Sequence, residues 1–204
     1  MPATRASTII FDLGNVLLDW NPRYLYSKIF SDKDEMEWFL EHVCTHDWQL
    51  ELDRGTPFAK AVAERTDLFP DYAKQIAAFD ARWQETLRGE IEGSVRLLEA
   101  LHDQGAPLYA LTNFSAEKYR DTRPRYHFFE RFRGVLVSGE EGVVKPDPAI
   151  YQLMLERFDL EAGDCLFIDD RQDNVTAARN IGMKAVCFQS PTQLEAALLD
   201  WGYF

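Results

Sequence analysis

The chain has 204 residues, 46% of them hydrophobic and 13% aromatic, which is enough for one buried core with a small second unit. Its formal net charge of -12 at pH 7 disfavours nucleic acid and anionic membranes as partners, because the average field of the protein would repel both. A phosphorylated small molecule is compatible with this charge, since local amides, a lysine and a divalent cation can bind an anion against such a field.

The cysteines and the N-terminus indicate a reducing compartment. Cys44, Cys165 and Cys187 are odd in number and lack the short spacings of a zinc or redox motif, so we expect no disulfide framework. The first residues lack the apolar stretch of a signal peptide, and no run reaches the roughly 18 apolar residues of a membrane span. We therefore expect a cytoplasmic protein.

Five short apolar runs are of strand type. They are rich in β-branched and aromatic residues and nearly continuous in hydrophobicity, which is typical of strands buried on both faces of a parallel sheet. In chain order they are Thr8 to Asp12, Pro107 to Thr112, Gly134 to Ser138, Cys165 to Asp169 and Lys184 to Phe188.

Helical patterns accompany the later strands. They cover Ser94 to His102, Ala149 to Phe158 and Val175 to Ile181, and Gly182 is placed to close the last helix as a left-handed cap. This alternation predicts a three-layer α/β fold, in which a doubly wound parallel sheet has right-handed crossovers.

A long insert separates the first two predicted strands. Residues 21–89 show helical periodicity and no convincing strand. We interpret them as a small helical bundle over the sheet, which divides the chain into a core domain of residues 1–20 and 90–204 and a helical domain of residues 21–89. The tryptophans of the insert could line a substrate pocket, although packing inside the bundle is favoured.

Polar residues end or follow four of the five predicted strands, where open α/β sheets bind their ligands. They are Asp12, Thr112 with Asn113, Ser138 with Lys145 shortly after, and Asp169 with Asp170. Because the carboxyl ends of parallel strands meet at one edge, we expect these side chains to converge.

The acids of this set predict a nucleophile or a cation site. Asp12 is followed by Gly14, which we expect to let the backbone turn sharply and expose the carboxylate. Asp169 and Asp170 would repel each other at the end of a buried strand, and a hard cation that also binds Asp12 would neutralise them. A solvated turn that caps the next helix is the alternative for these acids.

The remaining residues suit an anion. Thr112 and Asn113 offer a hydroxyl, an amide and backbone N–H groups for phosphoryl oxygens, and Lys145 could neutralise negative charge on a substrate. Taken singly, the first two could be a helix cap and the lysine an ordinary surface residue.

Four segments resemble the ordered motifs of the haloacid dehalogenase (HAD) superfamily. They are FDLGNVLLD at Phe11 to Asp19, LTN at Leu111 to Asn113, KPDPAIY at Lys145 to Tyr151 and IDDRQDN at Ile168 to Asn174. The insert resembles the helical cap that one subfamily carries after its first motif, and the DLGN sequence resembles that of sugar-1-phosphate phosphatases. The resemblance implies a Rossmann-like core with an inserted helical cap.

The resemblance also implies roles for the metal-binding residues. Asp12 would be the nucleophile that takes the phosphoryl group as an aspartyl-phosphate, which water then hydrolyses. Mg²⁺ would be held by Asp12, the backbone carbonyl of Gly14 and Asp170, with support from Asp169 and Asp173.

The same resemblance makes Thr112, Asn113 and Lys145 the groups that bind the transferring phosphoryl group. Lys145 would thus be both catalytic and substrate-binding. The implied activity is that of a magnesium-dependent phosphatase for a small phosphorylated metabolite, with a sugar phosphate as one candidate.

One position departs from the pattern of the superfamily. Most of its phosphatases carry a second Asp two residues after the nucleophile as general acid and base, and here that position is Gly14. Loss of a general acid typically costs about 10² to 10⁴ in rate. Asp19 could act as a substitute acid, but a role in the following turn is favoured.

Two other functions stay open. A 2-haloacid dehalogenase would use Asp12 to displace halide and would need no acid at Gly14, but such enzymes resemble this chain less, because they have a Ser-Ser-Asn type segment at Ile168 to Asp170. A low-activity protein that binds a phosphorylated metabolite would have kept the Mg²⁺ and phosphate site without turnover. The substrate and the oligomeric state are not determined by the sequence.

Overall fold

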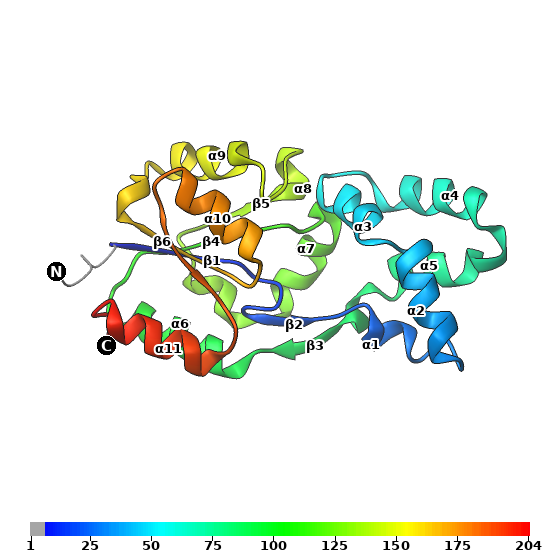
Figure 1. Cartoon of the computed structure of the whole chain (residues 1–204), viewed down its shortest axis with the longest axis horizontal. Coiled ribbons are helices and arrows are strands. Elements are labelled where there is room, and N and C mark those ends of the chain that lie inside the picture. The colour runs from blue at the N-terminus through cyan, green and yellow to red at the C-terminus, as the bar shows by residue number, and fades with distance from the viewer. Residues whose placement is uncertain (1–6) are drawn as a thin grey trace.

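The computed structural model describes residues 7–204 and contains a central parallel sheet (Figure 1). Its strands are β1 (Thr8–Phe11), β4 (Leu108–Thr112), β5 (Gly134–Val137), β6 (Cys165–Asp169) and β7 (Lys184–Cys187). They lie in the order β5-β4-β1-β6-β7, and all neighbouring pairs are parallel. Each strand coincides with a predicted apolar run to within one residue at either end, so the predicted sheet is confirmed.

Helices cover both faces of this sheet, as the predicted three-layer fold requires (Figure 1). One face carries α9 (Pro148–Phe158) and α10 (Gln172–Asn180), and the other carries α6 (Glu92–Asp103) and α11 (Pro191–Asp200). The helix predicted from Val175 begins three residues earlier, and Gly182 after it has a φ of +94°, as expected of a left-handed cap.

The alternation of side chains along β1 explains the two layers. Ile9 and Phe11 belong to the apolar cluster that includes α6 and α11, whereas Ile10 belongs to the cluster that includes α9 and α10. All three side chains are fully buried. A strand covered on both faces needs apolar residues at every position, which is why the hydrophobic run is continuous.

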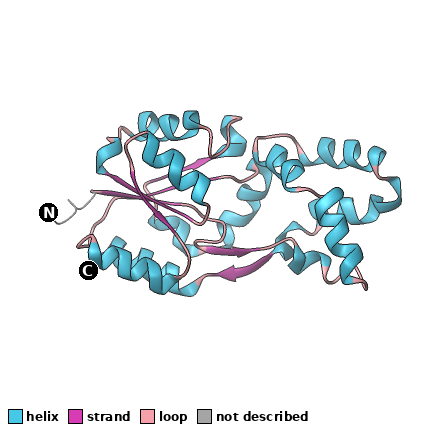
Figure 2. Ribbon diagram, viewed as in Figure 1, coloured by secondary structure: helices cyan, strands magenta, loops and turns pink. Residues whose placement is uncertain are grey.

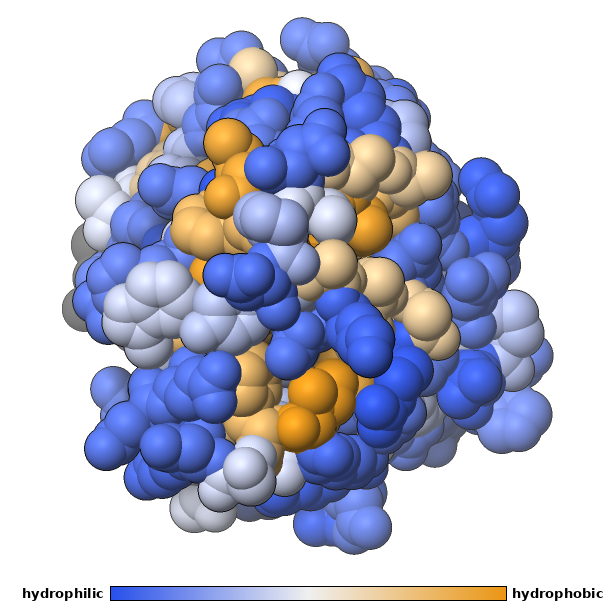
Figure 3. Space-filling model, turned by 90° about the vertical axis from the view of Figure 1, so that its right-hand side faces the viewer, coloured by the Kyte–Doolittle hydropathy of each residue, from blue (hydrophilic) through white to orange (hydrophobic). Residues whose placement is uncertain are grey.

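The insert forms a group of helices at one end of the molecule (Figure 1). Its helices are α1 (Arg23–Tyr26), α2 (Lys33–His42), α3 (His46–Asp53), α4 (Phe58–Leu68) and α5 (Ala73–Ala81), with the 3₁₀ helices η1 (Pro70–Tyr72) and η2 (Trp83–Thr86). Aromatic rings fill its centre, and Tyr26 and Phe39 meet edge to face at 4.9 Å. The outer end of the molecule is mostly hydrophilic with small apolar patches (Figure 3).

Two short strands connect the insert to the sheet. β2 (Leu18–Trp20) and β3 (Leu87–Glu90) form an antiparallel pair that runs between the two parts of the molecule (Figure 2). The prediction of no strand up to residue 89 was therefore wrong at its last residues. β3 is short and alternates between half-buried and exposed residues, so it lacks the continuous apolar run of the central strands. The proposed boundary at residue 89 lies inside β3, and the domain division stays a prediction.

The remaining elements lie near the carboxyl ends of the sheet or link its strands. They are α7 (Ala116–Thr122), α8 (Ser138–Glu141), η3 (Arg123–Arg125), η4 (His127–Arg131) and η5 (Ala162–Asp164). The three cysteines are free, as expected. Within residues 7–204, no helix has the length and apolar character needed to cross a membrane. The cytoplasmic location stays a prediction.

Candidate active site

The strand order brings the predicted site residues together at the middle of the sheet. The chain builds β4 and β5 on one side of β1 and then crosses to build β6 and β7 on the other side. Such a switch point leaves a crevice outside the carboxyl ends of the strands. Phe11 of β1 pairs with Ala110 of β4 and Ile168 of β6, so the residues that follow these strands meet there.

Lys145 lies at the centre of this crevice. Its Nζ atom is 2.9 Å from Asp12 Oδ1 and 2.7 Å from Asp169 Oδ2, and it donates a hydrogen bond of 3.0 Å to the carbonyl oxygen of Leu111. The side chain is 1% exposed, so it is not a surface lysine. Burial lowers the pKa of Lys145, but the charges of Asp12 and Asp169 outweigh this effect and hold the pKa above its usual value.

Asn113 fixes the backbone of Lys145. Its side-chain Nδ2 donates to the carbonyl oxygen of Lys145 at 3.0 Å, and the backbone N–H of Lys145 donates to Asn113 Oδ1 at 2.8 Å. Both ends of the amide are thus used within the protein. The structure places Asn113 where the sequence predicted it, and its direct contact with a phosphoryl group stays a prediction.

Asp169 is held in one orientation by several donors. It accepts hydrogen bonds from the backbone N–H of Arg171 at 2.8 Å and from Asn174 Nδ2 at 2.9 and 3.1 Å, in addition to Lys145. Asn174 is buried and was not among the predicted site residues. Its signal was its place in the IDDRQDN segment, at the start of the helix that follows β6.

Three acids form a cluster in the crevice. Asp12, Asp169 and Asp170 each offer a carboxylate oxygen, and these oxygens lie within 4.8 Å of one another. Burial raises the pKa of Asp12; Lys145 opposes this rise, and the charges of Asp169 and Asp170 add to it. Burial also raises the pKa of Asp170. A single ammonium group cannot balance three carboxylates, and an oxygen-binding divalent cation would, so these residues fit such an ion.

Asp173 is not brought into this cluster. Its carboxylate forms an ion pair of 2.7 Å with Arg171 Nη2 on the surface of the molecule, and the hydrogen bond from Arg171 holds the pKa of Asp173 below its usual value. Its predicted support of the metal would require the Arg171 pair to rearrange, and it stays a prediction.

Thr112 carries an unused hydroxyl at the end of β4. Its side chain is buried, and within residues 7–204 its Oγ1 atom has no hydrogen-bond partner. Buried hydroxyl groups are normally paired, so this hydroxyl, at the end of the strand next to β1, has a hydrogen bond left to offer.

The sharp turn after Asp12 does not depend on Gly14. The residue with left-handed backbone is Asn15, at a φ of +56°, and asparagine tolerates that conformation better than most residues. The expectation for Gly14 was therefore wrong in this respect. A Cβ atom at Gly14 would meet no atom of the described part of the chain within 4 Å, so the absence of a side chain leaves open space.

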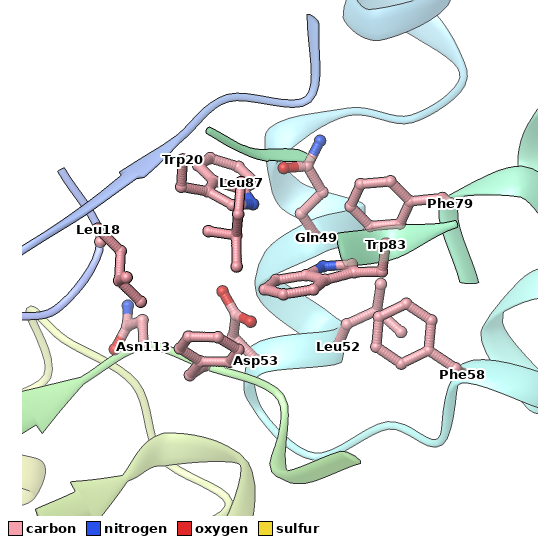
Figure 4. A pocket seen from close by; sticks show the side chains of 12 residues that line it. Leu18, Trp20, Gln49, Leu52, Asp53, Phe58, Phe79, Trp83, Leu87 and Asn113 are labelled. Carbon is pink, nitrogen blue, oxygen red and sulfur yellow. The ribbon is translucent and has the colours of Figure 1, made fainter. Parts of the chain in front are cut away.

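That space belongs to an apolar cavity of about 90 Å³ between the sheet and the insert (Figure 4). It is lined by Gly14, Leu18, Trp20, Gln49, Leu52, Asp53, Phe58, Phe79, Trp83, Leu87, Asn113 and Phe114. Trp83 of the insert thus faces the cavity, whereas Trp48 packs against Phe79 at 5.5 Å between ring centroids. Two of its lining residues are next to the site, because Gly14 lies two residues after Asp12 and Asn113 is hydrogen-bonded to the backbone of Lys145.

The protein is an α/β protein with a doubly wound parallel sheet. A buried aspartate and a buried lysine lie at the switch point of this sheet, where a carboxylate can act as a nucleophile. The family model of the haloacid dehalogenase-like hydrolases matches residues 6–182. The chain belongs to this family and is a hydrolase, which confirms the resemblance of the four motifs.

Known proteins similar to this chain include two phosphatases. The sesquiterpene phosphatase astK of Aspergillus oryzae is 28% identical over 187 residues, which cover 88% of each protein. A glyceraldehyde 3-phosphate phosphatase of Pyrococcus furiosus is 29% identical over 200 residues, which cover 91% of this chain and 81% of that protein. Several other curated relatives are matched over less than half of their own length.

A solved structure has the same fold. It is a HAD family enzyme from Bacteroides thetaiotaomicron in complex with magnesium and inorganic phosphate, with a TM-score of 0.71 and 21% identity. The match covers 90% of this chain and 94% of that chain. The likeness confirms the architecture of sheet and helices.

Proposed function

We propose that this protein is a Mg²⁺-dependent phosphatase that hydrolyses a small phosphate monoester through an aspartyl-phosphate on Asp12. The observation that carries the proposal is the buried ammonium of Lys145 between Asp12 and Asp169, with Asp170 as a third acid at hand. A fixed cation beside a nucleophilic carboxylate suits a reaction in which charge grows on phosphoryl oxygens.

Each residue of the crevice has its own role in this reaction. Lys145 holds Asp12 Oδ1 in place by an ion pair, and its positive charge attracts the phosphoryl group. The free hydroxyl of Thr112 donates to a phosphoryl oxygen. Asp12, Asp170 and the carbonyl of Gly14 would hold Mg²⁺, with Asp169 beside them. When bound, the ion neutralises the carboxylates and the charge on the phosphoryl oxygens.

The cavity favours an apolar alcohol as the other half of the substrate. Of the lining residues within 7–204, eight are apolar or aromatic, and Gln49, Asp53 and Asn113 carry an amide or a carboxyl group. A sugar has a hydroxyl on nearly every carbon, and burying these without partners would cost free energy. The relatives include both a sesquiterpene phosphatase and a glyceraldehyde 3-phosphate phosphatase, so a sugar phosphate is the second candidate.

The dehalogenase alternative is less well supported. Displacement of halide from carbon needs no divalent cation, so this reaction would not explain why Asp170 lies beside Asp12 and Asp169. A protein that only binds phosphorylated metabolites would share the whole crevice, and turnover alone distinguishes it.

The test is a substrate panel assayed with Mg²⁺ and with EDTA. It contains an aryl phosphate, phosphates of apolar alcohols, sugar phosphates and 2-haloacids, and Asp12→Asn serves as the blank. We expect phosphate release that disappears with EDTA and in Asp12→Asn, and that ranks the apolar phosphates above the sugars. Halide release that is indifferent to EDTA would overturn the proposal in favour of a dehalogenase. Tight phosphate-ester binding without release would favour the binding protein.

A further inference from the structure

A phosphatase with Gly14 after its nucleophile lacks the usual donor of a proton to the leaving alcohol. Among the described residues that line the cavity beside Gly14, Asp53 is the only one that can ionise. Its carboxylate points into the cavity, near Leu87 and Trp83 (Figure 4). Gly14, two residues after Asp12, lines this cavity, so the cavity offers space for the leaving group of an ester bound at Asp12.

Asp53 is held against the core although it belongs to the insert. It is the last residue of α3, and its side chain accepts a hydrogen bond from the backbone N–H of Ser115. Its carbonyl oxygen accepts a hydrogen bond of 2.5 Å from the hydroxyl of Ser138, the residue that follows β5. Both contacts come from segments at the carboxyl ends of the sheet.

The backbone after Asp53 allows the end of α3 to lie close to the core. Gly55 has a φ of +105°, and a Cβ atom there would lie 2.9 Å from the carbonyl oxygen of Gly139. A side chain at position 55 would therefore push the end of α3 away from the core. The sequence thus allows the carboxylate of Asp53 to sit over the crevice.

The surroundings of Asp53 suit exchange of a proton near neutral pH. Burial among apolar side chains raises the pKa of Asp53 to about 7, while the Ser115 N–H and the charge of Lys145 oppose the rise. A group with a pKa near the working pH can both donate and accept a proton efficiently.

Asp19, the substitute considered from the sequence, is placed differently. It lies in β2, where its carboxylate accepts a hydrogen bond of 2.7 Å from the hydroxyl of Tyr24 and lies 3.9 Å from Arg88 Nη1. Asp19 does not line the cavity that contains Gly14. Its partners make it part of the β2–β3 connection.

We propose that Asp53 is the acid and base of the reaction, in place of the residue missing at position 14. This inference rests on the proposed phosphatase function and adds a catalytic residue to it. In the first step an oxygen of Asp12 bonds to phosphorus, the ester P–O bond breaks, and the leaving oxygen takes the proton of Asp53. In the second step water gives its proton to Asp53 and its oxygen to phosphorus, which frees Asp12 and inorganic phosphate.

The test compares wild type and Asp53→Asn in single turnovers and with excess substrate, using aryl phosphates of increasing leaving-group pKa and an alkyl phosphate. A 4-nitrophenol leaves without a proton, so Asp53→Asn should release one equivalent of it in a burst and then turn over slowly. With the alkyl phosphate the first step itself should slow, by about 10² to 10⁴, the range expected for lost acid catalysis. The dependence of rate on leaving-group pKa should therefore steepen in the variant.

The open space at Gly14 provides a rescue. Gly14→Asp introduced into Asp53→Asn should recover part of the lost rate with poor leaving groups, because a carboxylate would again face the leaving oxygen. Gly14→Asn in the same background is the matched control and should recover nothing. Asp53→Glu keeps an acid and should retain more activity than Asp53→Asn.

Distinct outcomes separate this inference from the phosphatase proposal. If Asp53→Asn slows every substrate equally, or none, while circular dichroism shows a native fold, Asp53 is not the acid. If Asp53→Asn does not fold, Asp53→Ser replaces it as the variant without an acid, and a leaving-group dependence equal to that of wild type in Asp53→Ser overturns the inference. Absence of Mg²⁺-dependent turnover in the wild type would instead defeat the phosphatase proposal, whatever Asp53 does.

Discussion

At the scale of single residues, the crevice contains charges that a stable interior would avoid. The carboxylates of Asp12 and Asp169 are buried, and Lys145 is their shared counterion. Buried ion pairs of this kind contribute little to stability, because the cost of removing the charges from water offsets their attraction. Their concentration at the switch point of the sheet is what identifies the crevice as a functional site.

Asp53 gives a prediction for stability as a function of pH. Its carboxyl has a pKa of about 7 when folded and an ordinary value of 3.8. Between these values the folded protein binds more protons than the unfolded chain, so the contribution of Asp53 to stability falls as the pH rises. Asparagine does not ionise, so the melting temperature of Asp53→Asn should rise relative to wild type from about pH 4 to about pH 7 and then stay constant.

Thermal unfolding of both proteins across this pH range measures the effect. Asp67→Asn on the exposed surface of α4 is the matched control for the loss of one carboxylate. A constant difference between Asp53→Asn and wild type at all pH values would contradict the raised pKa.

At the scale of elements, Ser138 connects three segments of the chain. Its buried hydroxyl accepts a hydrogen bond of 3.0 Å from the backbone N–H of Phe114 and donates to the carbonyl oxygen of Asp53. The end of α3, the loop after β4 and the start of α8 therefore meet at one oxygen atom. This junction holds the insert at a defined distance from the nucleophile.

Removing this oxygen should loosen the junction. Ser138→Ala leaves a buried N–H and a buried carbonyl without their partner, and the expected loss in free energy of unfolding is about 1 to 3 kcal/mol. Urea denaturation measures it, and exposed Ser27→Ala, expected within about 0.5 kcal/mol of wild type, is the control. Equal stability of the two variants would show that water replaces the Ser138 hydroxyl.

At the scale of the whole molecule, the insert and the sheet share one apolar core. Leu98 of α6 and Leu194 of α11 belong to the same cluster as Phe39 and Phe79 of the insert. Polar contacts add to it, among them a hydrogen bond of 3.2 Å from the backbone N–H of Phe58 to Glu117 on α7. Binding at the crevice is therefore expected to affect the stability of the molecule as a unit.

Mg²⁺ should raise the melting temperature of the wild-type protein. A ligand that binds only the folded state stabilises it by about 2.7 kcal/mol at a concentration 100 times its Kd. Asp170→Asn removes one acid of the cluster and should lose most of this gain, whereas Asp173→Asn, whose carboxylate pairs with Arg171 outside the cluster, should keep it.

Thermal unfolding with MgCl₂, and with NaCl at equal ionic strength as control, measures this gain. A larger loss in Asp173→Asn than in Asp170→Asn would show that Asp173 moves into the site when the ion binds. No gain in the wild type would contradict a metal site at the cluster.

The sequence by itself determined the sheet and the convergence of Asp12, Lys145, Asp169 and Asp170, because strands buried on both faces are continuous apolar runs and their carboxyl ends share one edge. The sequence did not determine three other features: the ion pair of Asp173, the left-handed backbone of Asn15, and the strands β2 and β3. They depend on a surface ion pair, on one backbone angle and on runs too short for a periodic pattern.

Only the tertiary structure brought Asp53 to the site. It lies 41 residues after Asp12 in an amphipathic helix, and nothing in its local pattern distinguishes it from the other acids of the insert. Its role follows from packing, because the helix end is fixed over the crevice by Ser115 and Ser138, and apolar side chains then surround its carboxylate. Contacts between segments so distant in the chain leave no periodic signal in the sequence.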